Sequence, residues 1–542
     1  MFDDRNPQDE NTFVVSLKRL VWLLALIILI PLSVMVLQGI SQLFRISQQA
    51  STQLNALNSI SLRKADEGML TWLPDNPDSP RKMSDFEREQ LSHDYLLAYE
   101  ELNYALLSED ISGLESHFQE GALADVLNLL QAKGFESRRS QEKSQFITWD
   151  HQLELYFYSP DGITLALRDS YHYAQAFVLE ADILHMRFAK RSMDVLLNLN
   201  DGNWRIHHWR ILQEESLPTP DRKPLRLDNI YGINYIARSA PFNDLWPKFN
   251  PAEVEEDFAR IQGLGLNTVR FFIPFPAPEG LFEHLPNFLA LAERYELRLI
   301  PTLFDTYTCY CLEDMPKAMA YLDRLLPYLN HPSVLIVDVK NEADSDFSYR
   351  GKNRVRTFLT YILRYVRSYS DKPAFVGLIN LDEKLIAESD AISLHHYDYA
   401  KNLPKRIAEA KSYQKPILLE EFGFHTQIDK WPDPHTRRDQ AIYYQDIFAI
   451  TSTSGLGWLV WTLYDLPEGS MPGGREVERH LGILDSEARA KEVIQVLRGH
   501  IVEASWLERT RKYLWLSRPI LLSLIFLLML GLALSFFSKH RK

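Results

Sequence analysis

Two neighbouring carboxylates close an apolar run in the segment KPILLEEFGF (Lys415–Phe424). Consecutive side chains of a β-strand point to opposite faces, so we expect Glu420 and Glu421 to face in opposite directions. A carboxylate at the tip of a buried strand is costly unless it has a charged partner or a chemical role. The pair therefore predicts one carboxylate for chemistry and one for a salt bridge.

Four more apolar runs end in residues that suit acid–base chemistry and ligand binding. A carboxylate gives or takes a proton, an arginine orients a carboxylate, and an aromatic face packs against a flat apolar ligand. These residues are Arg270 in TVRFFIPF, Asn341 and Glu342 in VDVKNEAD, His395, His396 and Tyr397 in SLHHYDY, and Trp461 in LVWTLYD.

The elements that must position these residues follow a regular alternation from Asn229 onward. Helical stretches separate eight β-rich runs, namely NIYGINYI, NTVRFFIPF, LRLIPTLF, SVLIVDVKNE, PAFVGLI, AISLHHYDY, PILLEEFGF and GWLVWTLYD. Strands that alternate with helices form a parallel sheet, and eight such units fit an α/β fold of the closed (β/α)8 TIM-barrel type. Function gathers at the C-terminal strand ends of such barrels, where the residues above would meet. A doubly wound sheet is the alternative, but no Gly-rich phosphate loop follows the first strand.

These strand ends, taken in order, resemble the retaining (β/α)8 glycoside hydrolases, nearest to glycoside hydrolase family 5 (cellulase- and mannanase-like). That family has an Asn-Glu pair after strand four, here Asn341-Glu342, and a Glu-aromatic-Gly triplet after strand seven, here Glu421-Phe422-Gly423. The other matches are Arg270 on strand two, His395-His396-Tyr397 on strand six and Trp461 on strand eight. The resemblance covers about half of the chain. Strand three departs from the family pattern, because PTLFDTYT offers Phe304 and Asp305 where the family often has a histidine.

The resemblance implies a catalytic role for two glutamates. Glu421 would be the nucleophile and Glu342 the acid/base, with its pKa raised when Glu421 is charged. Arg270 would keep Glu421 ionised, and Tyr397 would hydrogen-bond the same carboxylate. Glu420 would then point away, into a salt bridge outside the barrel.

The remaining positions would bind substrate. Asn341 would hold a sugar hydroxyl, and Trp461 would stack on a pyranose ring or pack inside the barrel. His395 and His396 complete the predicted substrate-binding set. We predict no metal and no cofactor, because neither histidine belongs to a larger ligand cluster in the sequence.

A different pattern precedes the barrel, over residues 85–214. Helical stretches come first, and then strand runs that end in the hairpin DVLLNLNDGNWRIHHWRIL, with Asp201-Gly202 as its turn. Helices followed by a curved antiparallel sheet resemble the NTF2-like (cystatin-like) α+β fold, and the hairpin is similar to that family's closing hairpin. His207 and His208 lie on this hairpin, and we assign no catalysis to them.

The overall composition narrows the class of protein. The 542 residues include 59 Lys and Arg against 72 Asp and Glu, a net charge of −13 that disfavours nucleic acid as a partner. The two cysteines, Cys309 and Cys311, are too few for a disulfide framework, and we expect two free thiols in a barrel loop.

Both ends of the chain carry a predicted transmembrane helix. Residues 20–37 and 519–537 contain no charged residue, and a helix of about 20 such residues crosses a bilayer. A cleaved signal peptide is the alternative for the first segment. Arg5, Lys18 and Arg19 precede the first span, so the positive-inside tendency puts both termini in the cytoplasm and the rest outside it.

The predicted organisation runs in order along the chain. It comprises a cytoplasmic tail (1–19), a transmembrane helix (20–43), a helical or linker segment (44–84), the NTF2-like domain (85–214), a linker (215–228), the barrel (229–502), a juxtamembrane segment (503–517), a second transmembrane helix (518–538) and a short tail (539–542). The predicted protein is an inner-membrane, periplasm-facing glycoside hydrolase of β-linked poly- or oligosaccharides, placed near polysaccharide synthesis or export machinery. The alternatives are a non-catalytic glycan-binding or assembly protein and a transglycosylase.

Overall fold

The computed structural model describes residues 69–137, 142–179, 182–216, 225–428, 435–470 and 476–505. Both predicted membrane segments lie outside these residues. No helix within the described ranges has the length and apolar character needed to cross a bilayer.

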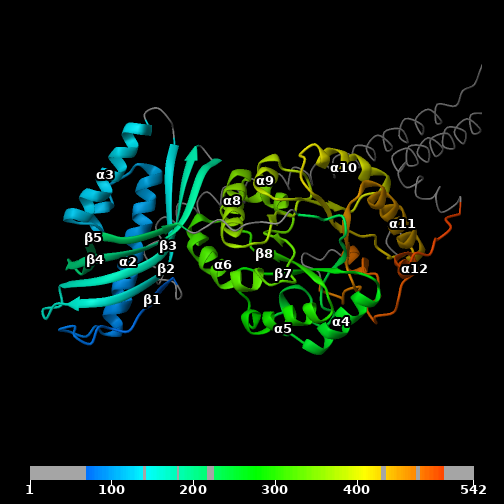
Figure 1. Cartoon of the computed structure of the whole chain (residues 1–542), viewed down its shortest axis with the longest axis horizontal. Helices are drawn as coiled ribbons and strands as arrows, with labels where there is room; N and C mark the ends of the chain where they lie inside the picture. Colours follow the sequence, from blue (N-terminus) through cyan, green and yellow to red (C-terminus); the bar gives the residue numbers. More distant parts are fainter. Residues whose placement is uncertain are drawn as a thin grey trace, which may run out of the picture. The chain divides into compact units, whose positions relative to one another are not determined.

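The first part of the fold is a five-stranded sheet with two long helices (Figure 1). Its elements are β1 (Leu70–Trp72), α2 (Asp85–Ser108), α3 (Glu120–Ser137), β2 (Glu142–Tyr158), β3 (Thr164–Leu179), β4 (Asp182–Asn200) and β5 (Asn203–Ser216). The strands lie in the order β1-β2-β3-β4-β5, and β2 to β5 pair antiparallel. The predicted order of helices followed by antiparallel strands is confirmed, whereas membership of the NTF2-like family stays a prediction.

Local sequence signals set the bounds of these elements. Ser84 and Glu87 form a capping box that starts α2, because each side chain accepts a hydrogen bond from the other residue's backbone N–H. Asp201 and Gly202 both have positive φ, at 53° and 81°, as a tight two-residue hairpin turn between β4 and β5 requires.

The second part is an eight-stranded parallel, barrel-like sheet surrounded by helices (Figure 1). Its strands are β6 (Tyr231–Asn234), β7 (Thr268–Ile273), β8 (Arg298–Leu303), β9 (Val337–Asp338), β10 (Ala374–Phe375), β11 (Ile392–His396), β12 (Ile417–Phe422) and β13 (Gly457–Trp461). Its helices are α4 (Pro251–Gly263), α5 (Leu281–Arg294), α6 (Met315–Leu329), α7 (Phe347–Arg350), α8 (Lys352–Tyr369), α9 (Glu383–Glu388), α10 (Leu403–Lys411), α11 (Arg437–Ser454) and α12 (Val493–Leu497).

The strand order brings together residues that are far apart in sequence. It runs β10-β9-β8-β7-β6-β13-β12-β11, and the Asp390 N–H, just before β11, donates to the Ala374 carbonyl of β10 at 2.8 Å. Each of the eight predicted runs contains a strand, and the predicted parallel, barrel-like sheet is confirmed. Because the strands are parallel, their C-terminal ends share one mouth. Arg270 of β7 and the two glutamates of β12 lie in strands whose residues are all buried.

The sheet domain and the barrel share one hydrophobic core. Ile147, Trp149 and Phe188 of the sheet pack in the same buried cluster as Tyr365 of α8. Asp323 of α6 ties the two parts together, because it accepts hydrogen bonds from Trp149 Nε1 at 2.7 Å and from the Tyr365 hydroxyl.

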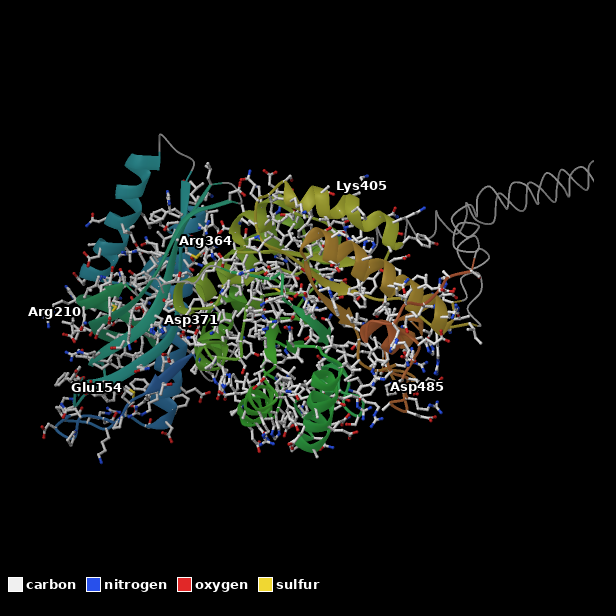
Figure 2. All side chains as sticks on the ribbon, turned by 45° about the vertical axis from the view of Figure 1, so that its right-hand side comes forward. Glu154, Arg210, Arg364, Asp371, Lys405 and Asp485 are labelled. Atoms are coloured by element: carbon white, nitrogen blue, oxygen red, sulfur yellow. A yellow bond between two sulfur atoms is a disulfide. The ribbon has the colours of Figure 1, made fainter. Side chains whose placement is uncertain are left out.

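A second polar contact lies between β4 and α8. Arg364 of α8, labelled in Figure 2, donates to the Ile183 carbonyl at 2.9 Å and pairs with Glu388. The two parts therefore meet through a packed face that polar contacts reinforce.

The two cysteines form a disulfide, so the expectation of free thiols was wrong. Their Cα atoms are 5.1 Å apart, within bridging range, although only one residue separates them. That residue, Tyr310, has a φ of 52°, and this left-handed turn brings the two side chains to the same side. The bridge lies in the loop that follows β8.

Candidate active site

Arg270 is the centre of a buried cluster of charges at the barrel mouth. Its side chain is fully buried and forms ion pairs with three carboxylates, namely Asp338 at 2.7 Å, Glu420 at 2.8 Å and Glu421. Burial lowers the pKa of Arg270, but these carboxylates outweigh it and the pKa is raised. The guanidinium therefore stays charged and fixes the positions of the carboxylates around it.

Two amide side chains complete the surroundings of this guanidinium. Arg270 Nη1 donates to Asn234 Oδ1 at 2.8 Å, and Arg270 Nη2 donates to Asn341 Oδ1 at 2.8 Å. Asn341 thus contacts the same arginine as the nucleophile candidate Glu421. Its predicted binding of a sugar hydroxyl stays a prediction.

Glu420 faces the inside of the barrel, so its predicted position in a salt bridge outside was wrong. A β-bulge is the physical reason, because Leu394 pairs with Leu419 while His395 pairs with Glu421, which leaves Glu420 as the extra residue. A bulge interrupts the strict alternation of side chains along a strand. Both glutamates therefore reach Arg270 from the same strand.

His395 bridges the carboxylates of three different glutamates. Its Nδ1 lies 3.1 Å from Glu342 and 3.4 Å from Glu421, and its Nε2 lies 3.3 Å from Glu420. An ionised carboxylate only accepts hydrogen bonds, so both ring nitrogens carry hydrogens. Burial lowers the pKa of His395, but the carboxylates outweigh it and raise the pKa to about 10. His395 is thus a second cation in the cluster.

Glu421 is held by three donors inside this cluster. Arg270 Nη1 pairs with Oε1, while Oε2 accepts from the Tyr397 hydroxyl at 2.8 Å and faces His395. Burial is the largest influence on Glu421 and raises its pKa, whereas His395, Arg270 and the Tyr397 hydroxyl lower it. The surroundings fix the direction of the carboxylate and partly offset the cost of its burial.

Glu342 lies at the open edge of the cluster. Its side chain is 26% exposed, whereas Glu421 is 3% exposed. Its backbone has φ 44° and ψ 44°, a left-handed conformation that costs a non-glycine residue about 1–3 kcal/mol. One carboxylate oxygen of Glu342 and one of Glu421 lie within 4.8 Å of each other, with a His395 ring nitrogen in the same group. One solvent-facing and one buried carboxylate therefore share a mouth.

The predicted residues Tyr397 and Trp461 both lie close to Gly423. Tyr397 is 44% exposed, yet its hydroxyl reaches Glu421. Trp461 is 7% exposed and packs against Phe272 in a buried cluster. A Cβ on Gly423 would lie 2.6 Å from the Trp461 carbonyl oxygen, so the glycine permits β12 and β13 to approach at this point.

His396 is placed apart from the two catalytic candidates. It is fully buried, and its Nε2 lies 3.1 Å from the Tyr399 carbonyl oxygen. Burial lowers its pKa, which favours the neutral ring. The structure thus brings Arg270, Asn341, Glu342, His395, Tyr397 and Glu421 together, and leaves His396 in the wall of the barrel.

A divalent cation would also find ligand atoms here, from Glu342, His395 and Glu421. A metal-bound imidazole must be neutral at the ligating nitrogen. The pKa of His395, raised to about 10, opposes that state at neutral pH.

Solved structures of several glycoside hydrolases show a distant likeness to the chain. It is similar to the exo-β-1,4-mannosidase Op5Man5 from Opitutaceae bacterium strain TAV5, at 21% identity and a TM-score of 0.43 over 52% of this chain and 60% of that one. It is also similar to GH5_18 from Streptomyces cattleya in complex with GlcNAc (16% identity, TM-score 0.44, 52% of this chain and 80% of that one). A third structure is a glycoside hydrolase family 17 β-1,3-glucanosyltransferase from Rhizomucor miehei (17% identity, TM-score 0.39, 49% of this chain and 96% of that one). No protein-family model and no curated protein sequence matches the chain. These likenesses are distant, so the chemistry of the site rests on its own geometry.

The sequence reasoning missed two members of the cluster, Asp338 and Asn234. Asp338 interrupts the apolar run VLIVDV, and a lone carboxylate inside such a run is the signal that would have found it. Its Oδ1 accepts from the Lys340 and Gly377 backbone N–H groups, so it also fixes the chain that leads to Glu342. Asn234 ends the first strand, and its amide donates to the Glu420 carbonyl oxygen at 2.9 Å.

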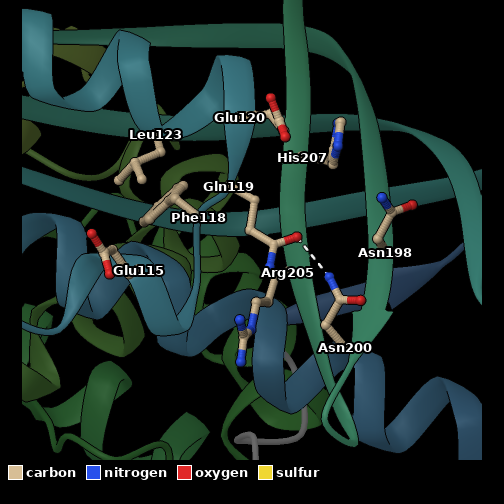
Figure 3. A pocket seen from close by; sticks show the side chains of 9 residues that line it. All are labelled: Glu115, Phe118, Gln119, Glu120, Leu123, Asn198, Asn200, Arg205 and His207. Atoms are coloured by element: carbon tan, nitrogen blue, oxygen red, sulfur yellow. Dashed lines mark hydrogen bonds between the residues drawn. The ribbon is translucent and has the colours of Figure 1, made fainter.

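The sheet domain carries a separate hollow of about 510 Å³ (Figure 3). Its polar wall includes a hydrogen bond from Asn200 to Gln119 at 2.7 Å. His207 lines it and Glu120 borders it, but no pair of buried carboxylates is present among its described lining residues. This hollow lacks the cluster of buried charges that characterises the barrel mouth.

Proposed function

We propose that this protein is a retaining glycoside hydrolase that cleaves a β-linked poly- or oligosaccharide by double displacement. The distance between Glu342 and Glu421 is the observation that carries the proposal. Retaining enzymes place their two carboxyl groups about 5–5.5 Å apart, whereas inverting enzymes need about 6.5–9.5 Å to admit a water molecule. Oxygens of the two glutamates within 4.8 Å agree with the shorter class.

The environment of each glutamate agrees with a different role. Glu421 is buried and accepts from Arg270 and Tyr397, so its position suits attack on the anomeric carbon as an ionised carboxylate. Glu342 is partly exposed, so its position suits donation of a proton to the departing glycosidic oxygen. In the second step Glu342 takes a proton from water, whose oxygen attacks the anomeric carbon and releases Glu421.

His395 would set the balance of charge between the two glutamates. As an imidazolium it faces Glu342 and Glu421 from the same nitrogen. It therefore stabilises negative charge on whichever carboxylate is ionised during the cycle. Its role is to position and neutralise the two glutamates, while bond making and breaking stay with them.

The sequence supports a location in the cell envelope. Uncharged segments at residues 20–37 and 519–537 would anchor the chain at both ends, and Lys18 and Arg19 favour a cytoplasmic N-terminus. The barrel would then act outside the cytoplasm, close to the membrane. Fusion of a periplasm-dependent reporter such as alkaline phosphatase at residue 505 should give activity, and an inactive fusion there would reverse the orientation.

A mechanism-based label tests the chemistry directly. The full chain in detergent is incubated with 2,4-dinitrophenyl 2-deoxy-2-fluoro-β-glycosides of glucose, mannose and galactose, and the labelled peptide is mapped by mass spectrometry. We expect the label on Glu421 and none on the Glu421→Gln variant. A label on the neighbouring Glu420 would overturn the assignment of the nucleophile, and absence of both label and hydrolysis would overturn the hydrolase proposal.

A further inference from the structure

Asp305 lies at the mouth of the barrel, directly after β8, on the side of the catalytic cluster. The preceding residue, Phe304, is fully buried and has a φ of 53°, a left-handed conformation that turns the chain at the strand end. The Phe304 ring packs 5.0 Å from that of Phe275, which holds this turn in place. Asp305 itself is half-buried. The left-handed turn at Phe304 thus fixes the direction in which the chain continues to Asp305, at a cost in backbone strain.

Lys340 lies beside Asp305, two residues before Glu342. Its residue is only 3% exposed, and its ammonium donates to the Asp305 carbonyl oxygen. Burial lowers the pKa of Lys340, while Asp305 and the nearby carboxylates oppose that shift. Burial raises the pKa of Asp305, while Lys340 and Arg270 lower it. Both side chains therefore lie within range of the charges of Asp338 and Glu342.

The hydrogen-bonding capacity of this pair is largely unused within the protein. Among the residues that the structure describes, no group donates a hydrogen bond to the Asp305 carboxylate, and the Lys340 ammonium has a single acceptor. An ammonium has three N–H donors, and a carboxylate has two acceptor oxygens. Water or a ligand hydroxyl can complete this free capacity.

We propose that Asp305 and Lys340 together bind adjacent free hydroxyl groups of the sugar ring held between Glu342 and Glu421. This inference rests on the proposed function and adds its substrate class. Each sugar hydroxyl both donates and accepts, so one donates to Asp305 while its neighbour accepts from Lys340.

The charges of the site indicate a neutral sugar. The buried or half-buried cations are Arg270, Lys340 and His395, and the carboxylates are Asp305, Asp338, Glu420 and Glu421, with Glu342 as the protonated acid. When these groups are ionised, the carboxylates exceed the cations by one. A uronic acid would bring a further negative charge into this site, where like charges repel most strongly because water is excluded.

The experiment uses the full chain in detergent and the 4-nitrophenyl β-glycosides of glucose, mannose, galactose, xylose and glucuronic acid. The neutral glycoside that the wild type hydrolyses fastest is then compared with its monodeoxy analogues. On the parent glycoside, we expect Asp305→Ala to lower kcat/KM about 10- to 100-fold, the worth of a hydrogen bond to a charged group. On the analogue that lacks the bound hydroxyl, wild type and variant should agree within about twofold.

Matched variants separate recognition from folding. Asp305→Asn keeps the side-chain volume and replaces Asp305→Ala in the experiment if Asp305→Ala does not fold. Lys340→Met should also lower kcat/KM on the parent glycoside. On the analogue that lacks the neighbouring hydroxyl, wild type and Lys340→Met should have similar kcat/KM. Asp371→Ala, at an exposed aspartate labelled in Figure 2, should leave kcat/KM unchanged.

The outcomes distinguish this inference from the function on which it rests. An active, labelled wild type whose Asp305 and Lys340 variants lose nothing, or lose equally on every monodeoxy analogue, would overturn the inference and leave the hydrolase standing. Preference for the glucuronide would overturn the assignment of a neutral sugar. A wild type with neither label nor hydrolysis would overturn the hydrolase proposal, and this inference with it.

Discussion

Among the residues that the structure describes, one cluster of buried polar side chains lies at the barrel mouth and another lies inside the sheet domain. In the sheet domain, His151 Nδ1 lies 2.7 Å from Asp169 Oδ2, and both side chains are fully buried. Tyr95 donates to the same carboxylate at 2.9 Å. In the barrel, Arg270, Glu420 and Glu421 are buried to the same degree.

The difference between the clusters is access. The barrel cluster opens to solvent through Glu342 and Tyr397, which are 26% and 44% exposed. The described members of the sheet cluster, His151, Asp169 and Tyr95, show no exposed side chain. Both clusters hold a histidine and a carboxylate, so residue types alone do not separate a reactive site from an internal polar core. The barrel cluster differs in that it pairs a partly exposed carboxylate with a buried one.

The largest expected effect contrasts Glu421 with Asp169. Glu421→Ala removes the attacking group, so kcat on the best glycoside should fall about 10⁴-fold or more. Asp169→Asn should leave kcat within about twofold, because the sheet cluster touches no substrate. Steady-state hydrolysis of 4-nitrophenyl glycosides measures both, and comparable losses in the two variants would show that solvent access does not distinguish the two clusters.

Removal of the second glutamate should have a smaller effect that depends on the leaving group. Glu342→Gln removes the general acid, so kcat should fall about 10²- to 10⁴-fold on a poor leaving group such as an alkyl alcohol. A dinitrophenol leaves without a proton. With this leaving group, Glu421 of the same variant should therefore be labelled or glycosylated at nearly the wild-type rate. Equal losses on both leaving groups would speak against an acid role for Glu342.

Loss of Arg270 should cost stability as well as activity. Arg270→Met leaves three buried carboxylates without their cation, which should lower the free energy of unfolding by about 3–5 kcal/mol. Asp169→Asn removes one acceptor from a cluster that keeps its tyrosines, and should cost about 1–3 kcal/mol. Thermal unfolding in detergent measures both. A Tm for Arg270→Met equal to that of the wild type would show that the ion pairs are not what holds the barrel mouth together.

The charge of His395 gives the barrel cluster a pH dependence. Its folded pKa of about 10 exceeds the usual unfolded value of about 6.5, so its contribution to stability is complete below pH 6.5 and is lost as pH rises towards 10. The difference in Tm between wild type and His395→Gln should therefore shrink from pH 6 to pH 10. A difference that stays constant over this range would mean that His395 is neutral.

Tyr397 should give the smallest effect. Tyr397→Phe removes a hydroxyl that donates to Glu421 at 2.8 Å and thereby favours its ionised form. Burial already raises the pKa of Glu421, and without this donor the pKa should rise further. The acid limb of kcat/KM should move to higher pH, with about a tenfold loss below the limb. An unchanged limb would assign that titration to another group.

Strand periodicity was sufficient to predict the barrel and to bring Arg270, Glu342 and Glu421 to one mouth. It failed at Glu420, because a bulge is a local irregularity of pairing that the sequence EE does not reveal. It also failed at Cys309 and Cys311, since the left-handed Tyr310 between them depends on the packing of the loop. Asp338 and Asn234 could have been predicted from the sequence, because each is a polar residue in or at the end of an apolar strand.

The core shared by the sheet domain and α8 has a practical consequence for dissecting the chain. A barrel expressed alone from residue 225 would present Tyr365 to water, and Asp323 would lose its indole donor from Trp149. A freshly uncovered aromatic surface promotes aggregation. The smallest well-behaved truncation should therefore begin before residue 69 and keep both parts, and removal of the sheet domain should reduce solubility even if the catalytic residues are intact.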